Sequence, residues 1–264
     1  MSTDPVLLEF DDEVATVTLN RPDVRNALAE ETALALADTF EEISDSDARC
    51  VVVEGAGEAF CAGGDISAMI EGVAGDHPVA ERIELIVSAI NGAIEAVHDC
   101  RLPVVAAIDG PAYGAGAGLA LACDVQLASP DAKIGFGFRR VGLAIDSGVS
   151  YFLPRIVGPN KAKELVFTGE LLDADAAREL GIFTRLFEAE EFEEGVDNMV
   201  ADIAAGPTVA LTQAKRLLDR GTELSFEQAL DREATAQGIA FTTDDHEEGA
   251  TAFMEQRSPD FEGR

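Results

Sequence analysis

The sequence predicts an α/β fold, because short apolar strand patterns alternate with stretches of helical periodicity along most of its 264 residues. Three patterns typical of buried strands are CVVVEG at 50–55, VVAAI at 104–108 and VQLAS at 125–129, with a predicted helix between each and the next. The hydrophobic fraction of 47% is that of an ordinary globular protein, and the length suits one substantial core. We therefore expect one main domain.

The elements are predicted in order from local patterns. The chain opens with an expected hairpin, since PVLLEF and VATVTL flank the turn DDE. Helices are expected at 32–43, at about 82–98 and from the glycine-rich segment to Cys123, and the signals beyond Leu153 are almost all helical. Three amphipathic helices follow, TVALTQAKRLLDR, SFEQALDREATAQGIAF and DDHEEGATAFMEQR. We place a core domain at 1–205 and a helical oligomerisation region at 206–264.

The charge balance is extreme for a folded chain. Fifty acidic residues face nineteen basic ones, which gives a formal net charge of −31. Apolar runs recur throughout, so the surplus belongs on the surface of a folded protein rather than in a disordered chain. Such a surface repels nucleic acid and anionic membranes, whereas molar salt screens its self-repulsion within roughly 3 Å. We expect a halophilic source; an acidic protein from an ordinary cell is the alternative.

Cysteine spacing and the N-terminus bear on compartment and cofactors. The four cysteines lie too far apart for a C-x-x-C zinc or redox motif, so we expect buried, reduced thiols and no metal. The stretch MSTDPVLLEFDDE lacks the features of a signal peptide, and no apolar run has the length of a membrane span. The sequence therefore favours a cytoplasmic protein without membrane partners.

Two glycine-rich loops follow predicted strands, EAFCAGGDI at 58–66 and DGPAYGAGAGLALACD at 109–124. Neither nucleotide motif fits: Phe60 and Leu119 occupy the last glycine position of the dinucleotide fingerprint, and no Gly-Lys-Ser or Gly-Lys-Thr triplet is present. Unpaired backbone N–H groups at a turn into a helix bind negative charge, so two such loops can form an oxyanion hole. The alternative is that the small residues only permit tight helix packing.

These two loops, with NRPDVRNAL near the N-terminus and GFGFRRVGLAIDSGVSYFLPRIVG in the middle, resemble the crotonase superfamily, the enoyl-CoA hydratase/isomerase family. The resemblance covers nearly the whole chain. It implies a crotonase (ClpP-like) spiral of β-β-α units, C-terminal helices for trimerisation, and a homotrimer or a dimer of trimers. It also implies an acyl-CoA substrate, with no cofactor beyond the coenzyme A that belongs to the substrate.

The resemblance also assigns roles to individual residues. The backbone N–H groups of Ala62 and Ala115 are expected to polarise the thioester carbonyl, as preorganised donors for the enolate. Arg25 is expected to meet a phosphate, with a solvated surface arginine as the alternative. The other residues implied at the substrate or coenzyme are Ala27, Gly63, Gly64, Asp65, Ile66, Gly114, Gly116, Gly118 and Phe138, with Phe241 and Arg257 reaching a neighbour's coenzyme.

The sequence departs from the hydratases at two positions. Hydratases carry two glutamates that hold and deprotonate water, and here these positions are Gly118 and Phe138. The remaining carboxylate in the catalytic segment is Asp146 in LAIDSG, which resembles the ring-epoxide and enoyl-CoA isomerases of phenylacetate degradation. The resemblance implies an isomerase with Asp146 as proton shuttle; the alternative for Asp146 is a helix N-cap.

The sequence leaves other functions of the protein open. The same oxyanion hole can serve hydration of 2-enoyl-CoA or hydrolysis of a thioester, and a non-catalytic acyl-CoA-binding subunit is a further alternative. The aromatic residues Phe136, Phe138, Tyr151 and Phe152 are expected to line an acyl pocket, with plain core packing as the equal alternative.

Overall fold

A computed structural model describes residues 4–65, 70 and 78–264. Its main sheet has six strands in the order β1-β2-β3-β4-β6-β9, in which the hairpin β1/β2 is antiparallel and every other pair is parallel. The second sheet, β5-β7-β8, pairs β5 with β7 in parallel and β7 with β8 antiparallel. The strands are β1 (Val6–Asp11), β2 (Val14–Leu19), β3 (Cys50–Gly55), β4 (Val104–Ile108), β5 (Pro111–Tyr113), β6 (Val125–Ala128), β7 (Lys133–Gly135), β8 (Leu171–Asp173) and β9 (Arg185–Leu186).

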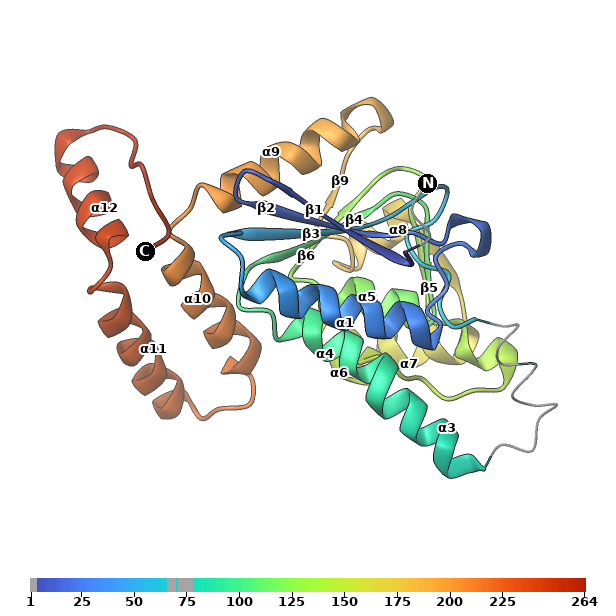
Figure 1. The fold of residues 1–264 in the computed structure, drawn as a ribbon. Helices are drawn as coiled ribbons and strands as arrows, with labels where there is room; N and C mark the ends of the chain where they lie inside the picture. Colours follow the sequence, from blue (N-terminus) through green and yellow to red (C-terminus); the bar gives the residue numbers. More distant parts are fainter. Residues whose placement is uncertain (1–3, 66–69, 71–77) are drawn as a thin grey trace.

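Helices cover both faces of the main sheet (Figure 1). One face packs against α1 (Glu30–Ser44), α4 (Gly92–His98) and α5 (Ala115–Ala122), and the other against α9 (Phe192–Ala204). Alternation along β3 explains how one strand serves both layers: Val51 and Val53 join the larger core, while Cys50 and Val52 join the cluster under α9. The predicted hairpin, the three central strands and the first helix are confirmed.

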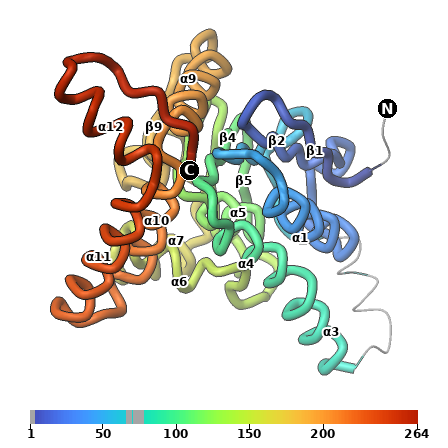
Figure 2. The backbone as a smooth tube through the Cα atoms, turned by 60° about the vertical axis from the view of Figure 1, so that its left-hand side comes forward, coloured from blue at the N-terminus to red at the C-terminus, as the bar shows by residue number. Residues whose placement is uncertain are grey.

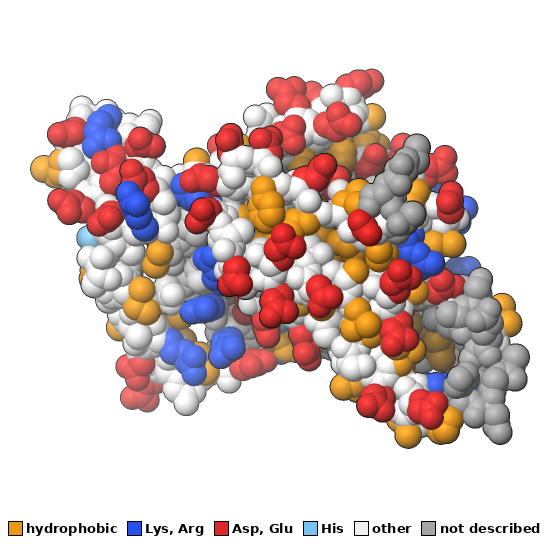
Figure 3. All heavy atoms as spheres, in the orientation of Figure 1, with side chains coloured by type: hydrophobic (Ala, Val, Ile, Leu, Met, Phe, Trp, Pro, Cys, Tyr) orange, Lys and Arg blue, Asp and Glu red, His pale blue; other side chains and the backbone are white. Residues whose placement is uncertain are grey.

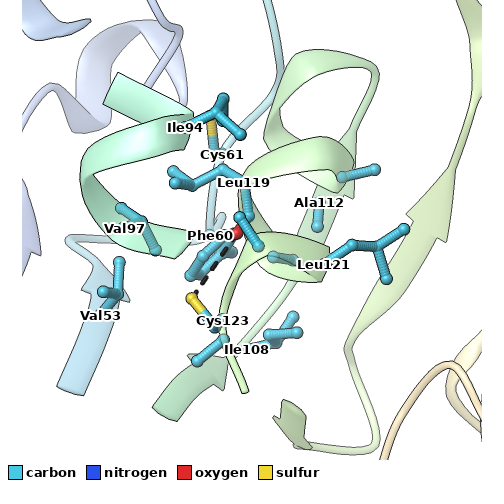
Figure 4. Packing of buried hydrophobic residues seen from close by; sticks show 14 of the residues in the cluster. Val53, Phe60, Cys61, Ile94, Val97, Ile108, Ala112, Leu119, Leu121 and Cys123 are labelled. Carbon is cyan, nitrogen blue, oxygen red and sulfur yellow. Dashed lines mark hydrogen bonds between the residues drawn. The ribbon is translucent and has the colours of Figure 1, made fainter. Parts of the chain in front are cut away.

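The larger core closes around α5, every residue of which is buried. Figure 4 shows Phe60 between α4 and α5, with Ile94 and Val97 on the α4 side. The Cys123 thiol, in the same cluster, donates to the Leu119 carbonyl at 3.6 Å. The four cysteines are free, and burial raises the pKa of the Cys50 and Cys61 thiols to about 12. These are packing residues rather than nucleophiles.

Two regions differ from the sequence prediction. The helix expected at 82–98 is continuous but contains a π-helical turn, as α3 (Val79–Leu85), the π-helix η2 (Ile86–Asn91) and α4. The short strands β5, β7, β8 and β9 were not predicted, because two or three residues carry no periodicity. The other short elements are the 3₁₀ helices η1 (Pro22–Val24), η3 (Gly137–Val141) and η4 (Ala189–Glu191), and the helices α6 (Val149–Val157), α7 (Pro159–Thr168) and α8 (Ala174–Glu179).

The predicted C-terminal helices are α10 (Thr208–Gly221), α11 (Phe226–Ala240) and α12 (Asp244–Glu255), and they extend to one side of the core (Figures 1 and 2). Arg49 links them to the core: its guanidinium donates to the Thr208 hydroxyl at 2.8 Å, to the Gly206 carbonyl at 2.5 Å and to the Phe261 carbonyl at 3.0 Å. The helices leave large apolar side chains in solvent, including Leu218, Phe226 and Phe253.

Carboxylates are spread over the visible face of the molecule, as the excess of acidic residues predicts (Figure 3). None of the helices in the described ranges has the length and hydropathy to cross a bilayer.

Candidate active site

The loop between β2 and α1 is organised by a buried asparagine. Asn26 is fully buried and adopts a left-handed conformation with φ 55°, which asparagine tolerates better than most residues. Its amide nitrogen donates to the Ala56 carbonyl at 2.9 Å and to the Ala59 carbonyl at 2.7 Å, and its oxygen accepts from the Arg21 N–H at 2.9 Å. Asn26 thereby ties this loop to the loop after β3. The sequence analysis missed this role.

The residues expected at the coenzyme lie on these two loops. The Arg25 side chain is exposed, and within residues 4–65, 70 and 78–264 no hydrogen bond or ion pair to its guanidinium is found. Ala27 is buried and its carbonyl accepts from the Arg21 guanidinium at 3.2 Å. Asp65 lies 3.6 Å from the same guanidinium. Ile66 falls outside the described residues. Arg21 therefore connects the two loops through its contacts with Ala27 and Asp65, a role that the sequence analysis did not single out.

The first glycine-rich loop was expected to supply its oxyanion donor from Ala62. The Ala62 N–H donates to the Arg25 carbonyl at 2.9 Å, so it is already used within the protein. Further along the loop, the N–H groups of Gly63 and Gly64 have no hydrogen-bond partner in the described part of the chain. The Ala62 N–H is therefore not free in this structure, and the unpaired N–H groups of this loop within the described residues are those of Gly63 and Gly64.

The second glycine-rich loop has the predicted form, a turn that leads into a helix whose first N–H groups are unpaired. Gly114 precedes α5 with φ 57°, a conformation open to glycine, and the Gly118 N–H closes the first helical turn on the Gly114 carbonyl at 3.1 Å. The N–H groups ahead of it, on Ala115 and Gly116, are unpaired at the helix N-terminus, within the described ranges. Ala115 is the first helical residue and is buried.

The two loops touch along their backbones. The Cys61 N–H donates to the Pro111 carbonyl at 3.1 Å, and the Tyr113 N–H donates to the Cys61 carbonyl at 2.9 Å. A Cβ on Gly63 would lie 3.3 Å from the Ala115 nitrogen, and a Cβ on Gly116 would lie 2.7 Å from the Cys61 Cβ. Glycine is required at both positions because the backbones are already in contact. The small residues therefore bring two sets of donors to one place.

Asp146 does not cap a helix. Helix α6 begins at Val149 with Gly148 as its N-cap residue, and no side chain bonds to the helix end. The Asp146 carboxylate instead accepts from the Ser147 hydroxyl at 2.8 Å. Partial burial raises the pKa of Asp146 above its ordinary value, while the Ser147 hydrogen bond opposes the rise. The Asp146 carboxylate is thus half-buried, with a raised pKa and a hydrogen bond from Ser147.

Positions 118 and 138, where hydratases carry glutamates, both lie in tightly packed surroundings. A Cβ on Gly118 would lie 2.7 Å from the Ser147 Cβ and closer still to the Ser147 carbonyl oxygen, so nothing larger than glycine fits. Phe138 is buried in the core. The Tyr113 ring lies over Gly135 and Gly137 in the same region, which explains those two glycines. Phe138 is therefore packed in the core, and its expected contact with substrate stays a prediction.

The four aromatic residues expected around an acyl group separate into two groups. Phe136 and Phe138 belong to the core, which agrees with the alternative of plain core packing for these two residues. Tyr151 and Phe152 pack edge-to-face with each other, and the His98 ring lies 5.2 Å from that of Phe152. These side chains help to line a pocket of about 370 Å³, together with Asn91, Ile94, Glu95 and Gly148.

The C-terminal residues expected near a neighbour's coenzyme lie on the extended helices. Phe241 is exposed with its ring 5.0 Å from that of His246. The Arg257 guanidinium binds both oxygens of Glu248, at 2.5 and 2.8 Å, and Glu255 at 2.8 Å. The hydrogen bonds from Arg257 and from the Asp260 backbone N–H lower the pKa of the Glu248 carboxyl to about 2. Figures 1 and 2 place α12 away from α5, so these residues do not join the site of their own chain.

Comparison with known proteins places this site in a family. The model of the enoyl-CoA hydratase/isomerase family matches residues 9–264. A crotonyl-CoA hydratase of Syntrophomonas wolfei is 33% identical, with 99% of each chain covered, and a 1,2-epoxyphenylacetyl-CoA isomerase of Escherichia coli is 31% identical, with 98% of each covered. The crystal structure of an enoyl-CoA hydratase from Mycobacterium smegmatis has a TM-score of 0.90 and 32% identity, covering 97% of this chain and 98% of that one.

Relatives named as hydratases are more numerous than those named as isomerases, so the names do not favour isomerisation. The family and the mixed α/β crotonase fold are common to all of them. The chain belongs to the enoyl-CoA hydratase/isomerase family.

Proposed function

We propose that the protein isomerises enoyl-CoA thioesters, moving a double bond between the 3 and 2 positions, with Asp146 as the proton shuttle. The observation that carries the proposal is the half-buried Asp146 carboxylate, which has a raised pKa and no capping role. Neither Gly118 nor Phe138, at the positions of the two hydratase glutamates, can transfer a proton. Ring-derived CoA esters fit the same chemistry, since one carboxylate suffices for it.

The unpaired N–H groups of Gly64 and Ala115 would hold the thioester oxygen. Negative charge grows on this oxygen as the α-proton leaves, and donors fixed by the backbone meet it without reorganisation. Asp146 would take the proton from the carbon next to the thioester of a 3-enoyl-CoA. The neutral acid would then return the proton at the γ-carbon, which leaves the conjugated 2-enoyl-CoA and restores the carboxylate. A raised pKa suits both halves of this exchange.

Coenzyme A would lie along the loop between β2 and α1. The exposed Arg25 guanidinium offers a planar donor pair for a phosphate. We further propose that the chain forms trimers through α10–α12 and that Phe241 and Arg257 meet a neighbour's coenzyme. For Arg257, a phosphate would have to compete with Glu248 and Glu255, which already occupy its guanidinium.

Hydration of 2-enoyl-CoA is the second candidate, and the names of several relatives favour it. It would need a water held by groups other than the two missing glutamates. Thioester hydrolysis through Asp146 and simple acyl-CoA binding are the remaining candidates. Each leaves a different product: hydration gives a 3-hydroxyacyl-CoA, hydrolysis releases a free thiol, and binding gives no product.

The test incubates the purified protein with matched 3-enoyl-CoA and 2-enoyl-CoA and separates the products by chromatography and mass. We expect double-bond migration, and we expect Asp146→Asn to lower it by about 10²–10⁴-fold, as for loss of a positioned acid–base group. Asp131→Asn, which neutralises an exposed carboxylate just before β7, is the matched control. Hydration that survives Asp146→Asn would rule out the proposed function.

A further inference from the structure

Ser147 has an unusual backbone conformation for a buried serine. Its side chain and backbone are 1% exposed, and its φ of 51° lies in the left-handed region that non-glycine residues seldom adopt. Gly148 follows with φ 75°, so the chain makes two consecutive left-handed steps before α6 begins. Such a conformation persists where the surrounding structure determines it, and it is found most often at functional sites.

The result of this turn is a hydrogen bond between neighbouring side chains. The Ser147 hydroxyl donates to Asp146 Oδ1 at 2.8 Å, and in the described part of the chain this is the carboxylate's hydrogen-bond partner. The Val149 N–H bonds to the Asp146 carbonyl at 3.1 Å and closes the turn below it. The carboxylate is thus held in one direction by a donor that is itself fully buried.

Contact with α5 fixes the turn relative to the oxyanion donors. The Ser147 backbone packs against Gly118, where a Cβ would collide with the Ser147 carbonyl oxygen. Gly118 is the residue whose N–H closes the first turn of α5, and Ala115 begins that turn. The serine therefore occupies the space that a larger side chain at position 118 would need.

We propose that Ser147 is a positioning residue for the Asp146 proton shuttle, which it orients through its hydroxyl and through its contact with Gly118. This proposal rests on the proposed function, because it needs Asp146 to be the base. It also explains the glycine at position 118, because a side chain there would prevent the turn that carries Asp146 from packing against α5.

Nearby charged groups do not supply the hydrogen bond that Ser147 donates to Asp146. The two influences on the pKa of Asp146 are burial, which raises it, and the Ser147 hydroxyl, which lowers it. Arg139 and Arg140 of η3 point to carbonyls of α7 and the residue after it. The other titratable groups of the described elements packed around this turn are Glu95 and His98 of α4, Tyr113 of β5, and Tyr151 and Arg155 of α6. The Arg155 guanidinium pairs with Glu223 at 3.2 Å.

The test compares Ser147→Ala and Ser147→Gly with wild type by the pH dependence of kcat/KM for isomerisation. Both variants lose the hydroxyl, and glycine also relieves the left-handed backbone, so the pair separates the hydrogen bond from backbone strain. We expect both to lower kcat/KM at neutral pH by roughly tenfold, as for a hydrogen bond to a charged group. We expect the acid limb of the profile to move to higher pH in both. Ser150→Ala, on the exposed side of α6, should match wild type.

Two outcomes would overturn the positioning role. One is an acid limb at the wild-type pH in Ser147→Gly, the variant least prone to misfold; the other is a defect in Ser147→Ala that Ser147→Gly restores. Asp146→Asn distinguishes the failure of the proposed function. If that variant keeps wild-type activity and its acid limb, the base is elsewhere; if it loses both while the Ser147 variants do not change, only the positioning role fails.

Discussion

Lys215 of α10 and Asp124, just after α5, form an ion pair of 2.8 Å that joins the C-terminal helices to the core. Both side chains are largely shielded from solvent, and each has a second partner: the Lys215 ammonium donates to the Leu102 carbonyl at 3.2 Å, and Asp124 accepts from the Val104 N–H at 2.7 Å. Burial raises the pKa of Asp124, while the lysine opposes the rise. The surroundings therefore fix both side chains in place. Loss of either charge would leave the other charged group shielded from solvent without its partner.

Removing the lysine should be costly because it leaves a shielded carboxylate without its cation. We expect Lys215→Met to lower the free energy of unfolding by about 3 kcal/mol, measured by denaturant titration. Lys161→Met, which breaks the exposed Lys161–Glu164 pair, should change it by less than about 1 kcal/mol. The double variant Lys215→Met with Asp124→Asn should recover part of the loss; a double variant no more stable than Lys215→Met would contradict this account.

Ala115 permits a direct test of the oxyanion hole. Proline fits the first position of a helix, where the N–H has no helical partner, so Ala115→Pro removes the donor while the helix can remain. We expect kcat for isomerisation to fall by about 10²–10³-fold with circular dichroism unchanged. Glu30→Pro, at the first position of α1, is the control and should retain activity. Full activity in a folded Ala115→Pro protein would exclude this donor.

The raised pKa of Asp146 predicts a stability effect. Because the folded state holds the proton more tightly than the unfolded state, stability is lost as pH rises from the ordinary value of 3.8 through the folded pKa. Asp146→Asn removes this penalty. We expect the variant to have a higher Tm than wild type at pH 7, and the difference to narrow as pH falls toward 4. A lower Tm at pH 7 would mean that the ionised carboxylate stabilises the fold.

The net charge of −31 predicts a dependence on salt. Raising KCl from about 0.1 M to about 1 M shortens the screening length from about 10 Å to about 3 Å and weakens repulsion between carboxylates. We expect Tm and the yield of refolding to rise over this range. Sucrose, which stabilises without screening, serves as the comparison; equal gains in sucrose and KCl would argue against a charge effect.

Much of the fold could be predicted because the signals are local. The hairpin, the strands at 50–55 and 104–108 and the three C-terminal helices follow from periodicity and turn residues within each segment. The two glycine-rich loops were recognised for the same reason: a run of small residues after a strand is visible in the chain itself. The strands of two or three residues, β5, β7 and β8 in the second sheet and β9 at the edge of the main sheet, were missed because their pairing partners lie in other segments of the chain.

The sequence by itself determined the order of the longer strands and of the helices, the two glycine-rich loops and the presence of one acid, Asp146, in the segment 135–158. Only the tertiary structure decided which backbone N–H groups are unpaired and how the turn that carries Asp146 packs. The Arg25 carbonyl accepts from the Ala62 N–H, which leaves the N–H groups of Gly63 and Gly64 as the unpaired ones of this loop within the described residues. The Ser147 turn packs against Gly118, so that position has no room for a larger side chain. Both results depend on contacts between segments distant in the chain, and hydrogen-bond partners across such contacts have no signature in either segment alone.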